Sequence, residues 1–195
     1  METKEKIINS AEELFGIKGF NGASIREISK HSSVNIAAIN YHFASKENLY
    51  LEVLKLNRIY LDNQIRKICL DELDVEDCVL KIFNLFVKNG DKVLLTFKYF
   101  MSEFEFEDLS VITSKNGNFG PPGFDLFLEF LTNKFPKKNK DYLSFVTKNL
   151  FSVICHNALA LSCPGIGKHL SKSKNYNLKI QQENLIQLTK VLVGV

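Results

Sequence analysis

Apolar residues recur at helical spacing along almost the whole chain, and this periodicity limits the possible folds more than any other feature. In residues 4–18, for example, Ile7, Ala11, Leu14 and Phe15 fall on one helical stripe. No segment alternates apolar and polar residues for long enough to indicate a sheet, and no internal repeat is visible. The sequence therefore predicts an all-α protein.

Composition excludes several other classes of protein. The chain has 195 residues, of which 45% are hydrophobic and 24% are charged, so it can bury a real core in one or two domains. No apolar run approaches the roughly 18–20 residues that span a bilayer. The N-terminus mixes charges with apolar residues, unlike a signal peptide. The cysteines form no CxxC pair, which is typical of reduced thiols, and we expect a cytoplasmic protein.

Turn and capping signals divide the chain into helices. Ser24 and Glu27 form an S-x-x-E capping box, Asn35 and Ser45 are suited to cap the next two helices, and Gly19 suits a C′ position. The segment at 114–123, SKNGNFGPPG, is predicted as a loop. The predicted helices cover 4–18, 25 to about 32, 36 to about 43, 46 to about 70, 75–88, 91–106, 124–135, 141–162 and 177–193.

The first three predicted helices have the organisation of a helix-turn-helix DNA-binding domain, whose second paired helix enters the major groove. In the helix that starts at Ile36, Ile39 and Phe43 share the core face, whereas Ala37, Ala38 and Tyr41 fall opposite. Net charge does not decide the matter, because residues 1–50 hold six basic and six acidic side chains. The prediction therefore depends on where particular side chains point.

The chemistry of this helix suits base reading. Asn40 can bond the N6 and N7 atoms of adenine together, and Ile36 can touch a thymine methyl. Donors to phosphate groups are predicted at Ser24, Tyr41, His42 and Lys46. Periodicity alone leaves open the alternative that these are ordinary surface residues of a small helical bundle.

The order and spacing of three motifs resemble the N-terminal domain of TetR-family transcriptional regulators. They are A-x-x-L-F-x-x-K-G-F in the first helix, S-I-R-E-I in the second, and Y-H-F-x-S-K-E-x-L across the third and fourth, within about residues 7–54. The resemblance implies that Arg26 reaches a base or phosphate and that Tyr41 and Lys46 hold phosphates. It implies that these residues face base edges: Ile36, Ala37, Ala38, Asn40 and His42.

Two positions depart from that family pattern. Ser33 stands where a glycine is usual before the valine, and it is strained if the position requires a positive φ. Ile36 replaces a common basic residue, which favours reading of a thymine methyl over a phosphate or guanine contact.

Other constellations do not support a catalytic or metal site. PGIGKHLSK lacks the Ser or Thr that a phosphate-binding loop needs after its lysine. Cys155, His156, Cys163 and His169 have no recognised zinc spacing. We therefore predict no metal, no cofactor and no enzymatic activity.

The sequence predicts a helix-turn-helix DNA-binding domain at 1–46 and a larger helical effector-binding and dimerisation domain at 47–195. The family resemblance implies a homodimer on palindromic operator DNA, acting as a repressor that a small molecule releases. The Phe-rich second domain favours an apolar or aromatic ligand, with these candidate ligand residues: Phe97, Tyr99, Phe100, Glu103, Phe127, Phe151 and His156. Two alternatives remain: an architectural or protein-binding DNA-binding protein without effector, and a helical enzyme.

The helices at 141–162 and 177–193 carry more apolar residues than one buried stripe needs. Two such helices from each subunit are expected to form a four-helix dimer interface.

Overall fold

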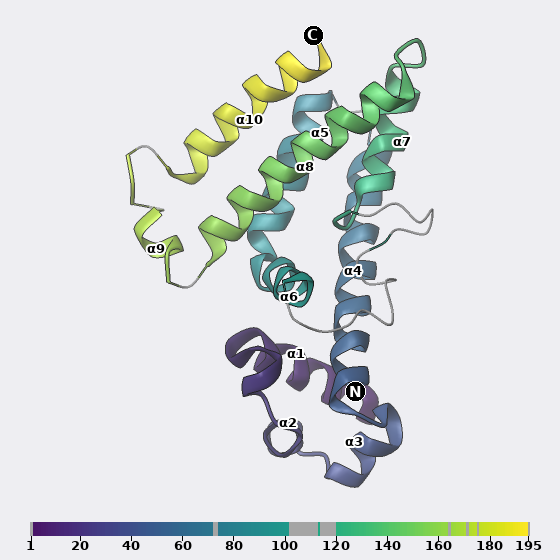
Figure 1. Ribbon diagram of the computed structural model, residues 1–195, viewed down its shortest axis with the longest axis vertical. Helices are drawn as coiled ribbons and strands as arrows, with labels where there is room; N and C mark the ends of the chain where they lie inside the picture. Colours follow the sequence, from purple (N-terminus) through teal and green to yellow (C-terminus); the bar gives the residue numbers. More distant parts are fainter. Residues whose placement is uncertain are drawn as a thin grey trace.

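The computed structural model describes residues 2–71, 74–101, 113, 120–163, 165–170, 172–174 and 176–194. The described elements are all helices, which confirms the all-α prediction (Figure 1). Three helices, α1 (Thr3–Gly22) and the shorter α2 (Ile25–Ser32) and α3 (Ile36–Phe43), gather at one end of an elongated molecule. The long helix α4 (Lys46–Leu70) starts there and runs into a larger bundle.

The larger bundle is built on α5 (Val75–Lys88), which packs against α4, α8 and α10. The bundle also contains α6 (Gly90–Phe100), α7 (Phe124–Lys134) and α8 (Lys140–Ser162). The chain then turns through the short α9 (Gly167–Leu170) and ends with α10 (Leu178–Val193). In the part of the chain that the structure describes, no helix is long and apolar enough to cross a membrane.

Most helix boundaries agree with the sequence predictions because local side chains fix them. Ser24, Asn35 and Ser45 each accept a hydrogen bond from a backbone N–H in the first turn of the helix that follows. Asp74 occupies the N-cap position of α5, but its side chain makes no capping hydrogen bond.

Two predicted helix ends differ from the structure, and one short helix was not predicted. The first helix does break at Gly19, which has φ 70°, but one more helical turn carries α1 to Gly22. The helix predicted for 91–106 ends at Phe100, and residues 102–106 lie outside the described residues. The sequence reading also missed α9, which has only four residues and therefore no readable periodicity.

Two hydrophobic cores hold the molecule together. One core fills the end that carries α1–α3 and includes Phe15, Ile39 and Leu49, all at most 1% exposed. The other core fills the larger bundle around Phe83, Phe86 and other buried side chains. The first core also takes in two α6 residues, Leu95 and Tyr99, so α6 belongs to the packing of both ends of the molecule.

Candidate nucleic-acid interface and ligand cavity

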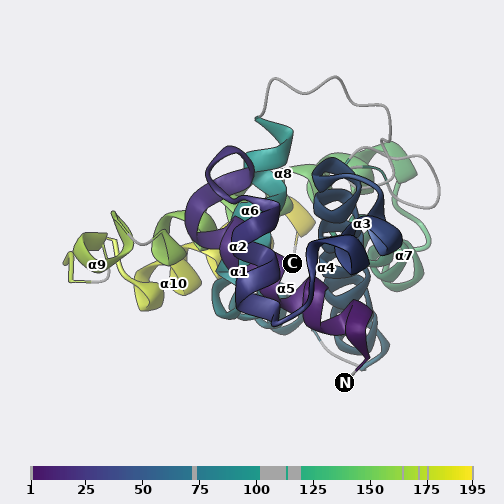
Figure 2. The same cartoon turned by 90° about the horizontal axis from the view of Figure 1, so that it is seen from below.

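The helix α3 buries one face and presents the other to solvent, as the sequence predicts. Ile39 and Phe43 are 1% and 6% exposed, whereas Ile36 and Tyr41 are 39% and 86% exposed. Ala37, Asn40 and His42 are also exposed, and Ala38 is half-buried. Seen from below, α2 and α3 lie at the near end of the molecule (Figure 2). The predicted base-reading side chains therefore share an open surface.

The turn between α2 and α3 is held by its own hydrogen bonds. The Ser29 hydroxyl donates to the Val34 carbonyl at 2.6 Å, and the Val34 N–H donates to the Ser29 carbonyl at 3.2 Å. Ser33 between them has φ 55° and ψ 32°, which is the left-handed region. This is the conformation for which glycine is best suited, so Ser33 carries the strain expected of it.

The Ser24 hydroxyl, predicted as a phosphate donor, is engaged with Glu27 in this structure. Its hydroxyl donates to Glu27 Oε2 at 2.9 Å and accepts from the Glu27 N–H at 3.2 Å. The Ser24 N–H also donates to Glu27 Oε2, at 3.0 Å. Because a hydroxyl has one proton, the capping box that starts α2 already uses the Ser24 donor.

Lys46 has a positioning role that the sequence reading missed. Its ammonium donates to the Phe20 carbonyl at 3.2 Å and to the Ala23 carbonyl at 3.3 Å. It also lies 4.2 Å from the centroid of the Phe20 ring. An ammonium has three protons, so one is left for a phosphate. Lys46 thus fixes the start of α4 to the end of α1 beside α3.

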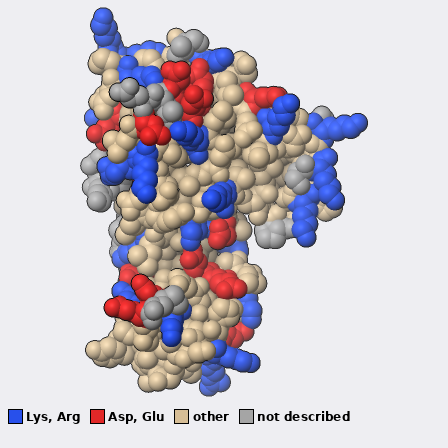
Figure 3. Space-filling model, turned by 180° about the vertical axis from the view of Figure 1, so that it is seen from behind, with Lys and Arg blue, Asp and Glu red and all other residues tan. Residues whose placement is uncertain are grey.

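Ion pairs explain how an end of zero net charge can expose cations. Lys18 pairs with Glu27 at 2.5 Å, and His31 lies 3.5 Å from Glu13. Arg26 and Lys30 are exposed on α2, and within the described ranges neither has a carboxylate partner. Lys and Arg side chains reach the lowest edge of this end in Figure 3. The sequence reading missed Lys30, although its spacing of four from Arg26 places both on one helical face.

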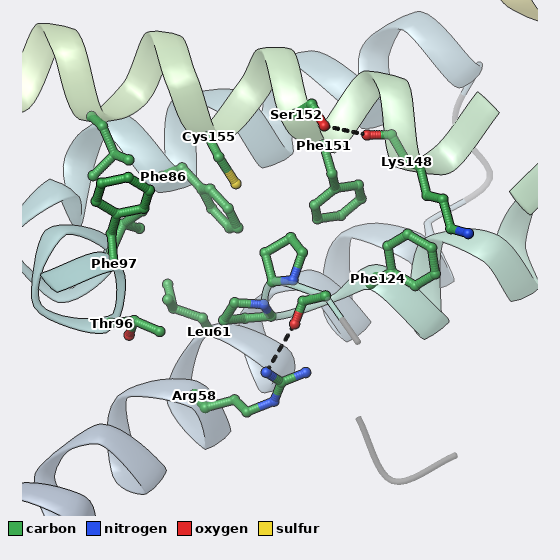
Figure 4. A pocket seen from close by; sticks show the side chains of 15 residues that line it. Arg58, Leu61, Phe86, Thr96, Phe97, Phe124, Lys148, Phe151, Ser152 and Cys155 are labelled. Atoms are coloured by element: carbon green, nitrogen blue, oxygen red, sulfur yellow. Dashed lines mark hydrogen bonds between the residues drawn. The ribbon is translucent and has the colours of Figure 1, made fainter. Parts of the chain in front are cut away.

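A cavity of about 390 Å³ lies between α4, α6, α8 and the start of α7 (Figure 4). Its walls are mainly apolar, with a few polar groups. The residues that line it are Arg58, Leu61, Phe86, Val93, Thr96, Phe97, Gly120, Pro121, Pro122, Phe124, Lys148, Phe151, Ser152, Cys155 and Leu159. This volume and this lining are those of a small-molecule site.

The structure brings two of the predicted ligand residues, Phe97 and Phe151, to this cavity. Phe127 packs behind Phe151 at 5.8 Å between ring centroids and does not line it. Tyr99 does not line this cavity and is buried in the other core, 5.9 Å from the Tyr50 ring. His156 is exposed on α8 and does not line the cavity either.

Two further ligand candidates cannot be placed. Glu103 and the side chain of Phe100 lie outside the described residues.

The polar residues of the cavity were missed because their proximity depends on how four helices pack. Arg58 could have been found from the sequence, because its spacing places a charged residue between Leu54 and Leu61 on the buried stripe of α4. Its guanidinium donates to the Gly120 carbonyl at 3.1 Å and lies 3.8 Å from Asp62. Burial lowers the pKa of Arg58, and the Asp62 carboxylate opposes this shift.

Asp62 and Gly123 hold the start of α7 against α4. The Gly123 N–H donates to Asp62 Oδ1 at 2.6 Å. Gly123 has φ 82°, and a Cβ there would lie 2.3 Å from the Ile65 side chain. Only glycine therefore fits at this corner of the cavity.

Cys155 places a thiol in the cavity wall (Figure 4). Burial raises its pKa to about 12, so the thiol stays protonated at neutral pH. Cys155 therefore acts as an apolar part of the lining rather than as a nucleophile.

Comparison with known proteins covers the N-terminal end by sequence and the whole chain by fold. The family model described as "Bacterial regulatory proteins, tetR family" matches residues 7–53. A probable HTH-type transcriptional regulator, YttP of Bacillus subtilis, is 53% identical over 49 residues, which is 25% of this chain and 24% of YttP. The negative transcriptional regulator IcaR of the Staphylococcus aureus icaADBC biofilm operon is 39% identical over 62 residues, 32% of this chain and 33% of IcaR.

The sequence match thus spans a quarter to a third of the length of these relatives. The whole fold is shared more widely: a TetR transcriptional regulator from Legionella pneumophila aligns with a TM-score of 0.71 at 20% identity, over 96% of this chain and 97% of that one. Both relatives are named as transcriptional regulators. Residues 7–53 thus match the N-terminal domain of the tetR family of bacterial regulatory proteins, and the whole chain shares the all-helical fold of a solved TetR regulator.

Proposed function

We propose that this protein is a sequence-specific transcriptional repressor that binds a palindromic operator as a homodimer and is released by a small apolar or aromatic ligand. The observation that carries the proposal is the exposed face of α3, on which Ile36, Ala37, Asn40 and Tyr41 stand free at one end of the molecule. The relative IcaR is named as a negative regulator, which supports repression. We assign DNA binding to residues 1–46 and effector binding and dimerisation to 47–195.

In this proposal α3 contacts the bases, and residues around it, including α2, contact the phosphates. Asn40 bonds an adenine edge and Ile36 contacts a thymine methyl, while the small side chains of Ala37 and Ala38 let α3 approach the bases. Tyr41, His42 and the remaining proton of Lys46 contact phosphates, as does Arg26 on α2. Lys30 joins Arg26 in this role because the two share one exposed face.

The proposed dimer interface is formed by α8 and α10, which pack side by side (Figure 1). An apolar patch is open to solvent where they meet: Tyr142 is 41% exposed, Phe145 53% and Val191 76%. The Tyr142 hydroxyl donates to the Leu192 carbonyl at 2.5 Å, which ties this end of α8 to α10. An isologous four-helix contact through these faces would cover the patch.

Release is proposed to run through α4 and α6. The helix α4 starts beside the phosphate-binding region at Lys46, and about 18 Å further along, at 1.5 Å per residue, it lines the cavity at Arg58. The helix α6 lines the same cavity through Thr96 and Phe97 and enters the α1–α3 core through Leu95. A ligand that moves either helix would change the separation of the two α3 helices, which DNA requires to be roughly 34–36 Å.

The cavity favours this function over an architectural DNA-binding protein without effector. Such a protein has no need of an apolar chamber of about 390 Å³. A closed second domain would have favoured the alternative, as would failure of every small molecule to change operator binding.

DNA recognition is tested by selecting bound fragments from a random pool with the purified protein. The enriched fragments should share a palindrome. Asn40→Ala should weaken binding to it by about 1–3 kcal/mol and relax the preference at one base pair per half-site. Asn63→Ala, an exposed asparagine on α4 far from α3, is the matched control and should bind like the parent. Equal binding by Asn40→Ala and the parent at matched salt would contradict the assignment.

The dimer and the release are tested separately. Sedimentation at micromolar concentration should give a dimer, and Phe145→Glu should shift the protein toward monomer. A monomeric parent protein would refute the interface.

For release, any ligand that lowers operator affinity a hundredfold must itself bind a hundredfold more weakly when operator is saturating. This factor corresponds to a coupling of about 2.7 kcal/mol. Equal ligand affinity with and without operator would remove the effector from the proposal.

A further inference from the structure

The charged side chains that line the cavity, among the described residues, are both cations. Among the described lining residues, Arg58 and Lys148 are cationic and none is an aspartate or glutamate. A purely apolar ligand would make no ionic contact with these two cations. The lining therefore carries information on ligand charge as well as on ligand shape.

Arg58 is already neutralised within the protein. It lies 3.8 Å from Asp62 and donates to the Gly120 carbonyl. Its side chain runs along the floor of the cavity toward that carbonyl in Figure 4. Arg58 therefore holds the wall in place and contributes little net charge to a ligand.

Lys148 differs from Arg58 because the described residues supply it with no ion pair. Figure 4 shows its side chain leaving α8 and ending near Phe124 at the edge of the cavity. The sequence has no acidic residue from 142 to 182, and Asp141 precedes Lys148 by about two helical turns, or roughly 10 Å. Within the described part of the chain, the Lys148 ammonium is therefore the lining cation that has no ion-pair partner.

The other polar groups of the lining are committed elsewhere. The Thr96 hydroxyl donates to the Lys92 carbonyl at 3.1 Å, and the Ser152 hydroxyl donates to the Lys148 carbonyl at 2.8 Å. Each hydroxyl has only one proton to give. Among the described lining residues, Lys148 is thus a cation whose donors no ion pair uses, and it can orient a ligand.

We propose that the ligand is an anionic amphiphile, with a carboxylate bound by Lys148 and an apolar body among Phe86, Phe97 and Phe151. This inference rests on the proposed function only in that the cavity takes a ligand. Apolar burial against the rings supplies most of the affinity, and the ammonium supplies the preference for charge. About 390 Å³ is at the small end of ligand sites, which favours a body of medium length.

The test compares three probes that share a ten-carbon chain: decanoate, decanol and decyltrimethylammonium. Binding to the full chain is measured by calorimetry below the concentration at which each probe forms micelles. Decanoate should bind at least tenfold more tightly than decanol, and the cation should bind most weakly. The same order should weaken at high salt, because the ammonium lies at the exposed edge of the cavity.

Substitution of the lysine tests its role. Lys148→Met should remove the preference for decanoate while leaving decanol affinity within about twofold, and Lys148→Arg should restore it. Lys140→Met, at the exposed start of the same helix, is the matched control and should behave like the parent. Unchanged melting temperatures would show that each variant is folded.

Three results would overturn the inference: none of the probes binds, decanol or the cation binds as tightly as decanoate, or Lys148→Met keeps the preference. These results are independent of the proposed function. A charge preference without any effect on operator binding would support this site and contradict ligand-controlled repression. Operator binding without binding of any probe would support DNA recognition and contradict this ligand site.

Discussion

The Lys92 ammonium on α6 donates hydrogen bonds to the Glu12 carboxylate on α1 and, at 3.1 Å, to the Asn57 side-chain oxygen on α4. Two neighbouring bonds support this bridge. The Tyr50 hydroxyl donates to the Leu95 carbonyl at 3.4 Å, and Lys98 donates to the Gly16 carbonyl at 3.3 Å. The helix that lines the cavity is thereby joined to the helix on which α2 and α3 rest.

Removing the ammonium should destabilise the whole molecule. Lys92→Met leaves Glu12 and the 4%-exposed Asn57 without this donor, and a lost partly buried hydrogen-bond donor costs about 1–3 kcal/mol. We expect the free energy of unfolding in urea to fall by that amount. Lys88→Met, at the exposed end of α5, should leave it within about 0.5 kcal/mol. A parent-like midpoint for Lys92→Met would show that the bridge contributes nothing to stability.

Glycine at position 44 should stabilise the protein. Ala44 has φ 62° and ψ −42°, and the Ser45 N–H donates to the Phe43 carbonyl at 2.7 Å, which is the strained γ-turn. Relief of this strain should exceed the entropy that glycine adds to the unfolded chain, so Ala44→Gly should raise the free energy of unfolding by about 1 kcal/mol.

The matched substitution Ala37→Gly tests the sign of this effect. Ala37 lies inside α3, where glycine costs about 1 kcal/mol. Chemical denaturation of the two variants should therefore shift the midpoint in opposite directions. A loss of stability in both variants would mean that the strain at Ala44 is not relieved by glycine.

At low pH the protein should lose the stabilisation that the ionised Glu27 carboxylate contributes. Hydrogen bonds from Lys18, from the Ser24 N–H and from the Ser24 hydroxyl lower its pKa from 4.5 to about 2. A lowered pKa in the folded state stabilises the protein above the unfolded value, and this stabilisation is lost as the pH falls from about 4.5 toward 2.

Thermal melts of Glu27→Gln and the parent should therefore differ by a constant amount above about pH 5, and this difference should shrink as the pH falls from about 4.5 toward 2. Glu47→Gln, an exposed residue on α4, serves as the control and should follow the parent throughout. A constant difference for Glu27→Gln down to pH 2.5 would contradict the role of the ionised carboxylate.

The thiols should react in a fixed order. Hydrogen bonds from the N–H groups of Ile166 and Gly165 lower the pKa of Cys163, whereas burial raises that of Cys155 to about 12. A hydrogen bond with the Cys69 thiol, together with burial, raises the pKa of Cys78. Because the thiolate is the reacting form, iodoacetamide at pH 7.5 should modify Cys163 well before Cys155 and Cys78.

Peptide mass spectrometry over time measures this order, and the same reaction in guanidinium removes the effect of folding. Similar rates for all four thiols in the folded protein would contradict it.

Local chemistry accounts for the parts of the fold that the sequence predicts. The caps at Ser24, Asn35 and Ser45 act on N–H groups three residues away, so a short window contains both partners. The face of α3 follows in the same way from helical periodicity, which separates Ile39 from Tyr41. The strain at Ser33 was expected if the position needs a positive φ, because the family pattern has glycine there, and Ser33 does have a positive φ.

Long-range packing decided the rest. Lys46 and Ser24 both lie where phosphate donors were expected, yet one bonds carbonyls at the end of α1 and the other bonds Glu27. Tyr99 and Phe97 are two residues apart on one helix, and only the packing of α6 sends Tyr99 to one core and Phe97 to the cavity. Sequence spacing gives the angle between side chains on a helix but not which neighbour lies at each angle.

The sequence by itself thus determined the helices, their caps and the exposed face of α3, because these depend on hydrogen bonds and periodicities within a few residues. The tertiary structure alone decided the cavity, the partners of Arg58 and Lys92 and the position of Lys148 in the cavity wall. Each of these joins residues dozens of positions apart, and their distances are set by how α4, α6, α7 and α8 pack together rather than by any local preference.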